Sequence, residues 1–145
     1  IGVDLTIKSV SAIAHQSILN ENGKMELGPY IPVPPHSSSL VGHGAFWDLQ
    51  PGAYAIEFDQ GLKKLEPNEN AFIIQRSSLN RAGTQIVGSV YDPGFETDTL
   101  GATMNVATPI RIYQHARVAQ ILIDNNEPVK KESLYEGTWQ NKGNR

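Results

Sequence analysis

Short apolar runs bounded by Gly, Pro and Asn dominate the hydrophobic pattern of the chain, and a helical repeat is hard to find in it. The runs recur about every ten to fifteen residues, a spacing typical of an all-β domain with many short strands. Turn signals such as Asn22-Gly23, Pro51-Gly52 and Pro93-Gly94 separate them. The pattern predicts strands at residues 2–10, 53–58, 71–75, 84–90, 102–106, 110–112 and 118–123.

The longest irregular stretch, residues 28–44, holds four Pro and three consecutive Ser. We expect an ordered loop inside one domain here, because neither flank alone could bury a core. Phe46 and Trp47 follow this stretch and are expected to anchor it to the core. Residues 1–145 are therefore expected to form a single domain, with a C-terminal tail from about residue 130.

Composition and charge exclude several classes of protein. The chain has no Cys, which excludes a disulfide scaffold, a thiolate metal site and a cysteine nucleophile. A net charge of −3 argues against a nucleic-acid partner, although it leaves room for one phosphate ligand. No N-x-[ST] sequon and no apolar run near the ~18 residues of a membrane helix occur. We expect an intracellular, cytoplasmic protein without a membrane partner.

The four histidines, His15, His36, His43 and His115, show no HxxxH or HExxH spacing. A tight metal site made by the protein alone is therefore not expected. Surface or loop positions are the prediction for all four.

The densest group of chemistry-bearing residues begins with Arg76-Ser77-Ser78, where the third predicted strand ends. A helix is expected over residues 77–83, with Ser77 or Ser78 capping its start and Gly83 ending it. An arginine, two hydroxyls and the N–H groups of a helix start suit a phosphate. Taken alone, however, Arg-Ser-Ser before a helical turn is usually just a helix cap.

An aspartate stands before a Pro-Gly turn in the run Tyr91-Asp92-Pro93-Gly94-Phe95. Such an Asp ordinarily forms the turn, with its carboxylate bonded to nearby backbone N–H groups. The aromatic neighbours also suit a sugar ring, whose hydroxyl the carboxylate could meet. A third segment, Arg117-Val118-Ala119-Gln120, indicates by itself only a strand that enters the core.

In order and spacing these segments resemble the trimeric dUTPase and dCTP deaminase superfamily. Ile1-Gly2-Val3-Asp4-Leu5 is similar to its first motif, residues 76–83 to its second, residues 91–95 to its third and residues 117–120 to its fourth. The tail, residues 135–143, is similar to the closing segment of the deaminase-like branch rather than to the glycine-rich last motif of ordinary dUTPases.

The resemblance implies a distorted β jelly roll, often called a β-clip, assembled as a homotrimer with active sites at the subunit boundaries. Both family reactions start from a deoxynucleoside triphosphate. In hydrolysis, Asp92 would bond the sugar 3′-hydroxyl and deprotonate the water that attacks the α-phosphorus. Mg²⁺ would be held mainly by the triphosphate, without a metal site of the protein. Phe95, in place of the family's usual Tyr, would exclude a 2′-hydroxyl, and backbone groups of residues 83–91 would read uracil.

The resemblance also implies a set of substrate-binding side chains. Arg76, Ser77 and Ser78 would bind the phosphates from a subunit next to the one that supplies Asp92, with Gln120 assisting. Arg81 and Arg117 would either do the same or be surface charges, Arg117 beside an acidic neighbour. Tyr135, Trp139, Gln140 and Lys142 would belong to a tail that closes over the ligand, unless the tail is simply a disordered polar segment.

In the deaminases that this chain resembles, the proton shuttle is a Glu about ten residues beyond the third-motif Asp, and the resemblance places Ala102 at that position here. No Glu occurs between Glu96 and Glu127, so we predict a dUTP diphosphatase. Two alternatives stay open: a dCTP deaminase or bifunctional enzyme with its proton shuttle elsewhere, and a catalytically silent nucleotide-binding trimer. Glu96 and Asp98 depart from the family pattern because they put two carboxylates near a polyanionic ligand.

Overall fold

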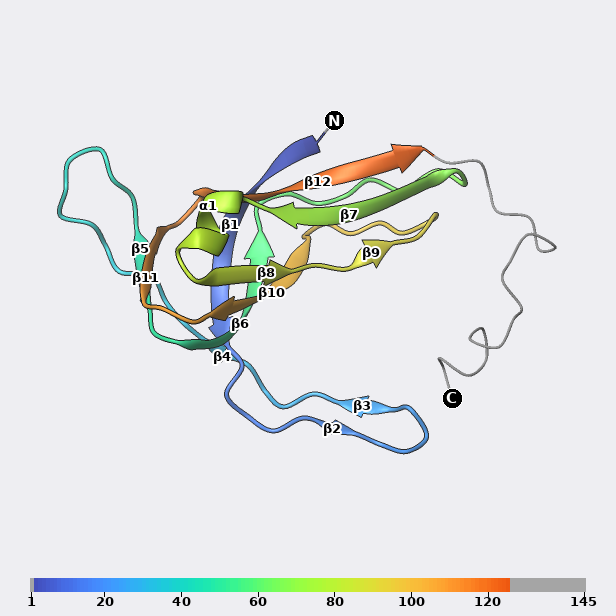
Figure 1. Ribbon diagram of the computed structural model, residues 1–145, viewed down its shortest axis with the longest axis horizontal. Coiled ribbons are helices and arrows are strands. Elements are labelled where there is room, and N and C mark those ends of the chain that lie inside the picture. The colour runs from blue at the N-terminus through green and yellow to red at the C-terminus, as the bar shows by residue number, and fades with distance from the viewer. Residues whose placement is uncertain (1, 126–145) are drawn as a thin grey trace.

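The computed structural model describes residues 2–125, and its regular elements are strands apart from one five-residue helix (Figure 1). The all-β prediction is confirmed. The elements in chain order are β1 (Gly2–Ala12), β2 (Ile18–Leu19), β3 (Met25–Glu26), β4 (Ile31–Pro32), β5 (Phe46–Leu49), β6 (Gly52–Phe58), β7 (Glu69–Gln75), α1 (Ser77–Arg81), β8 (Thr84–Val87), β9 (Val90–Tyr91), β10 (Gly101–Val106), β11 (Ile110–Tyr113) and β12 (Arg117–Asn125). Within residues 2–125 no helix is long and apolar enough to cross a membrane.

A curled antiparallel sheet makes up the body of the protein. Its strand order is β8-β10-β6-β1-β12-β7-β9, with β4 pairing beside β1. Strands β5 and β11 form a second, two-stranded sheet, and β2 and β3 form a hairpin that projects from the body (Figure 1). This jelly-roll-like arrangement places the starts of β12 and α1 at the C-terminal end of β7, and it places strand β9 beside Ala71 and Phe72 in the first half of β7.

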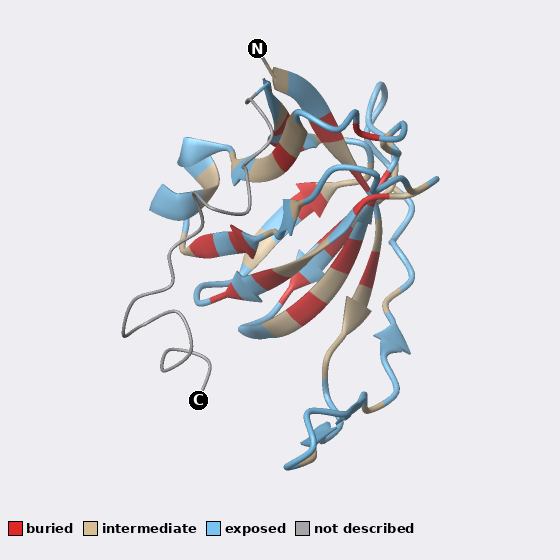
Figure 2. Cartoon of the chain, turned by 90° about the vertical axis from the view of Figure 1, so that its right-hand side faces the viewer, coloured by how far each residue is buried: buried red, intermediate tan, exposed pale blue. Residues whose placement is uncertain are grey.

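The core follows from the period-two alternation of the strands. In β6, Tyr54, Ile56 and Phe58 are buried while their neighbours are less so, which is the pattern of a strand with one face on the core. Figure 2 shows buried residues alternating with intermediate and exposed ones along the curled sheet, whereas the β2–β3 hairpin is exposed. The largest fully buried side chains are Trp47, Phe58, Leu5, Ile7, Leu49, Ile56, Leu100, Met104 and Val118.

The proline-rich stretch is ordered, as expected, and several contacts attach it to the rest of the protein, among them a bridge between His36 and Phe46. Strand β4 within it pairs with the end of β1. Trp47, only 1% exposed, donates its indole Nε1–H to the carbonyl of Val33 across 2.7 Å. The predicted anchoring role of Trp47 is thus confirmed, although the strand on which it lies, β5, was not among the predicted ones.

The prediction of one continuous strand at residues 84–90 is wrong, because the structure has two strands there. Strand β8 ends at Val87 and β9 begins at Val90, so Gly88 and Ser89 lie outside both ladders. A Cβ at Gly88 would lie 2.7 Å from the Cβ of Ile73. The backbone therefore approaches β7 more closely here than a side chain would allow.

The helix α1 ends as predicted, with Gly83 in the left-handed conformation at φ +85°. Its start differs from the prediction: the N-cap residue is Arg76, and no side chain caps the helix. Arg76 is still in extended conformation because it continues β7, so the helix begins one residue later at Ser77. Neither Ser77 nor Ser78 is used as a cap.

Candidate functional site

A bulge in β12 shapes the first part of the site. In the ladder between β1 and β12, Leu5 pairs with Ala119 and Thr6 pairs with Arg117, so Val118 is an extra residue. The carbonyl of Val118 accepts a hydrogen bond from the backbone N–H of Arg76 across 2.8 Å. The bulge thereby attaches the end of β7 to the start of β12.

A pocket of about 320 Å³ lies at this junction, and we call it the cationic pocket. Three of the predicted substrate-binding residues, Arg76, Ser77 and Gln120, line it together. The other lining residues are Asp4, Ile74, Gln75, Arg117 and Ala119. The structure thus joins parts of the first, second and fourth sequence motifs. Two guanidinium groups beside a hydroxyl and an amide form a donor set that suits phosphate oxygens.

Arg117 is paired with an acidic neighbour, one of the two possibilities expected for it. Its guanidinium lies 3.5 Å from the carboxylate of Asp4, and the two side chains are 49% and 60% exposed. An ion pair this open to water contributes little to stability. The ion pair with Asp4 therefore leaves Arg117 able to bind an anion.

The side chain of Gln75 fixes the neighbouring strand β8. Its amide Nε2 donates to the carbonyl of Thr84 and its Oε1 accepts from the N–H of Ile86, at 3.0 and 2.9 Å. Ser78 and Arg81, by contrast, are exposed on α1 and do not belong to the lining of the cationic pocket.

Asp92 follows β9 and is exposed. Its backbone carbonyl accepts the N–H of Phe95 across 3.1 Å, and Gly94 adopts φ +88°. The turn is therefore closed by the backbone of Asp92, while its carboxylate accepts no hydrogen bond from any of residues 2–125. The alternative in which the carboxylate of Asp92 accepts hydrogen bonds from the backbone N–H groups of its own turn is therefore wrong.

Phe95 stacks on Tyr91, with ring centroids 4.7 Å apart and planes 20° from parallel. Burial raises the pKa of the Tyr91 hydroxyl, which lies 3.4 Å from the carbonyl of Gly101. The two rings form a flat apolar wall next to Asp92.

A second pocket, of about 540 Å³, lies where the residues between β8 and β9 meet β10. Val87, Ser89, Ala102 and Thr103 contribute to its lining. Its one lining carboxylate is Glu57, which accepts the hydroxyl hydrogen of Ser9 across 2.8 Å. Glu57 is distant from position 102 in the sequence, but it lies on the neighbouring strand β6 opposite Gly101. The sequence around Ala102 therefore gives no sign of it.

The two parts of the site lie at opposite ends of β7 within one chain. Tyr91, next to Asp92, pairs with Ala71 near the start of β7, whereas Arg76 follows its last residue. Five residue-to-residue steps along the extended strand lead from Ala71 to Arg76, which is roughly 16 Å. In Figure 1, α1 follows the arrow tip of β7, whereas β9 lies alongside an earlier part of that strand.

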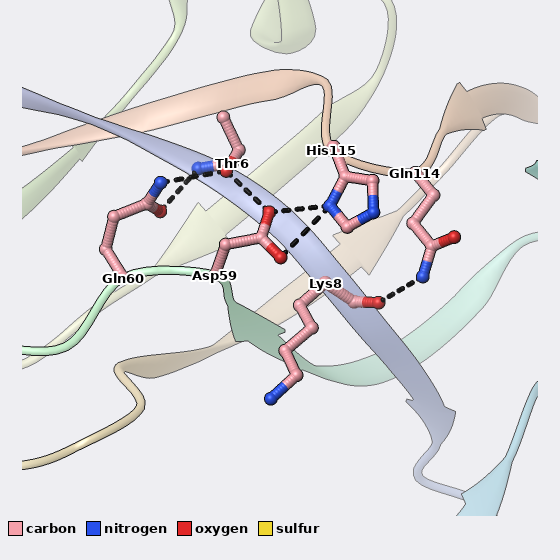
Figure 3. A network of polar contacts seen from close by, with 6 residues as sticks. All are labelled: Thr6, Lys8, Asp59, Gln60, Gln114 and His115. Atoms are coloured by element: carbon pink, nitrogen blue, oxygen red, sulfur yellow. Dashed lines mark hydrogen bonds and ion pairs between the residues drawn. The ribbon is translucent and has the colours of Figure 1, made fainter. Parts of the chain in front are cut away.

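A polar network beside the bulge was not predicted. His115 contacts the carboxylate of Asp59, which also accepts a hydrogen bond from Thr6 (Figure 3). His115 was expected to be an ordinary surface or loop histidine, and it is exposed in a turn. The sequence offers no local sign of this contact, because Thr6, Asp59 and His115 lie far apart in the chain and only the fold brings them together.

Among residues 2–125 no group of three or more His, Asp or Glu side chains could hold a metal ion. The predicted tail residues Tyr135, Trp139, Gln140 and Lys142 lie outside the described residues.

Comparison with known proteins identifies the family. A sequence profile described as dCTP deaminase-like matches residues 1–126, and the chain belongs to this family. Two curated relatives are similar over most of its length. A protein of Aeropyrum pernix named probable deoxyuridine 5′-triphosphate nucleotidohydrolase is 30% identical over 98% of this chain and 84% of its own. One of Methanocaldococcus jannaschii, named deoxyuridine 5′-triphosphate nucleotidohydrolase, is 32% identical over 95% of this chain and 83% of its own.

A solved structure has the same fold. The crystal structure of 2′-deoxycytidine 5′-triphosphate deaminase from Agrobacterium tumefaciens superimposes with a TM-score of 0.60 over 86% of this chain at 14% identity. This chain spans 39% of that one, and at this identity the likeness concerns the fold alone.

Proposed function

We propose that this protein is a dUTP diphosphatase that hydrolyses dUTP to dUMP and diphosphate. The observation that carries the proposal is the meeting of Arg76, Ser77 and Gln120 in the cationic pocket. The names of the two curated relatives support the same substrate.

In the proposed reaction the carboxylate of Asp92 takes a proton from a water molecule, whose oxygen attacks the α-phosphorus. The bond between that phosphorus and the oxygen bridging to the β-phosphorus breaks, and diphosphate leaves. The absence of any hydrogen bond to the Asp92 carboxylate within residues 2–125 supports this role, because a base must have a free lone pair. Arg76, with its guanidinium fork, would hold the charge of the departing diphosphate.

Mg²⁺ is proposed to arrive with the substrate. Residues 2–125 offer no cluster of metal ligands, and Mg²⁺ commonly binds through phosphate oxygens and water with few protein ligands. When bound, the ion would offset triphosphate charge. The acid–base and positioning roles belong to the side chains named above.

We further propose a homotrimer with each active site shared between subunits. The α-phosphorus and the diphosphate of one substrate lie only a few ångströms apart, but Asp92 and the cationic pocket of one chain lie at opposite ends of β7. The base and the phosphate-binding groups of one site would therefore come from different copies of the chain.

The nucleoside is proposed to lie on the wall formed by Phe95 and Tyr91. A ring packed against the sugar leaves no room for a 2′-hydroxyl, which would exclude ribonucleotides. Gly88 and Ser89, which lie outside both ladders, are the backbone positions proposed to read uracil. Ser78 and Arg81 are proposed to reach the phosphates from the outer side of α1.

The rival function is deamination of dCTP, and one observation favours it. Glu57 places a carboxylate in the pocket that Ala102 and Ser89 line, where a proton shuttle would be needed. Its exposed position and its hydrogen bond to Ser9 are equally those of a surface residue. A catalytically silent trimer is the second rival.

Incubation of the enzyme and Mg²⁺ with dUTP, dCTP, dTTP and UTP, followed by assay of diphosphate and ammonia together, separates these functions. Diphosphate from dUTP without ammonia from dCTP supports the proposal. Ammonia from dCTP that disappears in Glu57→Gln would establish the deaminase. Nucleotide binding without either product would leave the silent trimer.

A further inference from the structure

His115 is the one non-glycine residue among residues 2–125 with a positive φ, at 68°. The left-handed conformation crowds the Cβ of any L-residue, so it persists only where surrounding contacts hold it. The backbone supplies two of these contacts at the turn: the N–H of His115 donates to the carbonyl of Ile7 at 2.7 Å, and the N–H of Ile7 donates to the carbonyl of Ala116 at 3.0 Å.

The side chain of His115 supplies a third contact. Its ring Nδ1 lies 2.9 and 3.0 Å from the two carboxylate oxygens of Asp59. Because an ionised carboxylate only accepts, the proton of this bond is on Nδ1. The same carboxylate accepts the hydroxyl hydrogen of Thr6 across 2.6 Å, and the amide of Gln60 bonds both the N–H and the hydroxyl of Thr6 (Figure 3).

These contacts attach three segments to one another directly beside the β12 bulge. Thr6 is the partner of Arg117, the residue just before the extra residue Val118. His115 lies two positions before Arg117, and Asp59 follows the end of β6 and donates its N–H to the carbonyl of Thr6. Strands β1 and β12 are therefore fixed to each other at Thr6, directly beside the bulge. This keeps the carbonyl of Val118 in the position in which it accepts the hydrogen bond from the N–H of Arg76.

We propose that Thr6, Asp59 and His115 are positioning residues for the cationic pocket: they hold the bulge, and through it they set Arg117 and the backbone of Arg76. The inference rests on the proposed function, in which this pocket binds the diphosphate part of the substrate. None of the three residues lines the pocket, so their effect would be indirect.

The test compares full-length variants by calorimetric binding of inorganic diphosphate and by steady-state kinetics with dUTP. His115→Gly removes the ring but suits the left-handed backbone, so it should fold well. If the network positions the pocket, His115→Gly and Asp59→Ala each weaken diphosphate binding about tenfold and raise KM for dUTP with kcat little changed. His115→Asn should restore binding, since the Asn Nδ2 is joined to Cγ as the His Nδ1 is, and Asn tolerates this conformation.

Asp48→Ala is the matched control. The Asp48 carboxylate is also exposed and also forms an ion pair, 2.7 Å from Arg111, but it lies on the separate β5–β11 sheet. Its removal should leave diphosphate binding and KM for dUTP unchanged. Wild-type diphosphate binding in His115→Gly and Asp59→Ala would overturn the inference while leaving the proposed function intact. Wild-type binding in Arg76→Ala would instead overturn the assignment of the pocket itself, and the inference with it.

Discussion

Asp92 and Arg76 lie at opposite ends of strand β7, because Tyr91 pairs with Ala71 while Arg76 follows Gln75. In the proposed reaction the base and the phosphate ligand of one site would therefore come from different copies of the chain.

This separation predicts complementation between two inactive variants. Asp92→Asn and Arg76→Ala should each be nearly inactive alone, but co-expression should create sites with an intact Asp92 from one chain and an intact Arg76 from another. If the two variants assemble at random in equal amounts, the chain that supplies position 92 has an even chance of carrying Asp92, and the neighbouring chain has an even chance of carrying Arg76. About a quarter of the sites are then intact, so about a quarter of wild-type diphosphate release should return. Mixed assemblies as inactive as their parents would contradict the shared site.

Phe95 should govern the choice of sugar. Phe95→Ala removes the ring that stacks on Tyr91 and should lower the preference for dUTP over UTP, measured as a ratio of kcat/KM, by about tenfold or more. Phe95→Tyr keeps the flat ring and should keep the preference. An unchanged ratio in Phe95→Ala would show that the sugar lies elsewhere.

Trp47 should stabilise the fold through its hydrogen bond as well as through its burial. Trp47→Phe leaves the carbonyl of Val33 without its indole partner and opens a small void, so the free energy of unfolding in urea should fall by about 1–3 kcal/mol. Tyr30→Phe, at an exposed position between β3 and β4, should change it little. Equal losses in both variants would argue against a specific anchor.

The Asp59 carboxyl should make stability depend on acid pH. Partial burial raises its pKa, but the hydrogen bonds from Thr6 and His115 and nearby positive charge outweigh this, so that the pKa is lowered overall. Its stabilisation is thus present above the unfolded pKa of about 3.9 and is lost as pH falls through the lower, folded value. Urea midpoints between about pH 2 and pH 7 should show Asp59→Asn less stable than wild type near neutrality, with the two curves converging in acid.

A gap between the two curves that stays constant across this range would contradict that linkage. Some acid dependence should remain in the variant, because the hydrogen bond from Arg111 also lowers the pKa of Asp48.

The long strands could be predicted from the sequence because their apolar positions alternate. The prediction for residues 53–58 differs from β6 only by Gly52. Strands β2, β3 and β4 are two residues each and exposed, so they carry no apolar alternation from which to find them. In β5 the buried pair Trp47 and Leu49 does alternate, a signal that the short run FWDL made easy to miss.

The site was predictable in its residue types and only partly in its geometry. The adjacent buried residues Val118 and Ala119 break the period of two in β12, which is a local sign of the bulge. Nothing in the sequence marks the left-handed turn at His115, because the usual glycine is absent there. The contact between Asp59 and His115 joins positions that only the sheet order brings together.

The central claim is that Asp92 activates the water that attacks dUTP. The most direct measurement is diphosphate release from dUTP in single turnover by wild type and Asp92→Asn, with dUTP binding measured on both. We predict a loss of roughly 10²- to 10⁴-fold in the rate with binding retained. A variant that releases diphosphate at the wild-type rate would contradict the account.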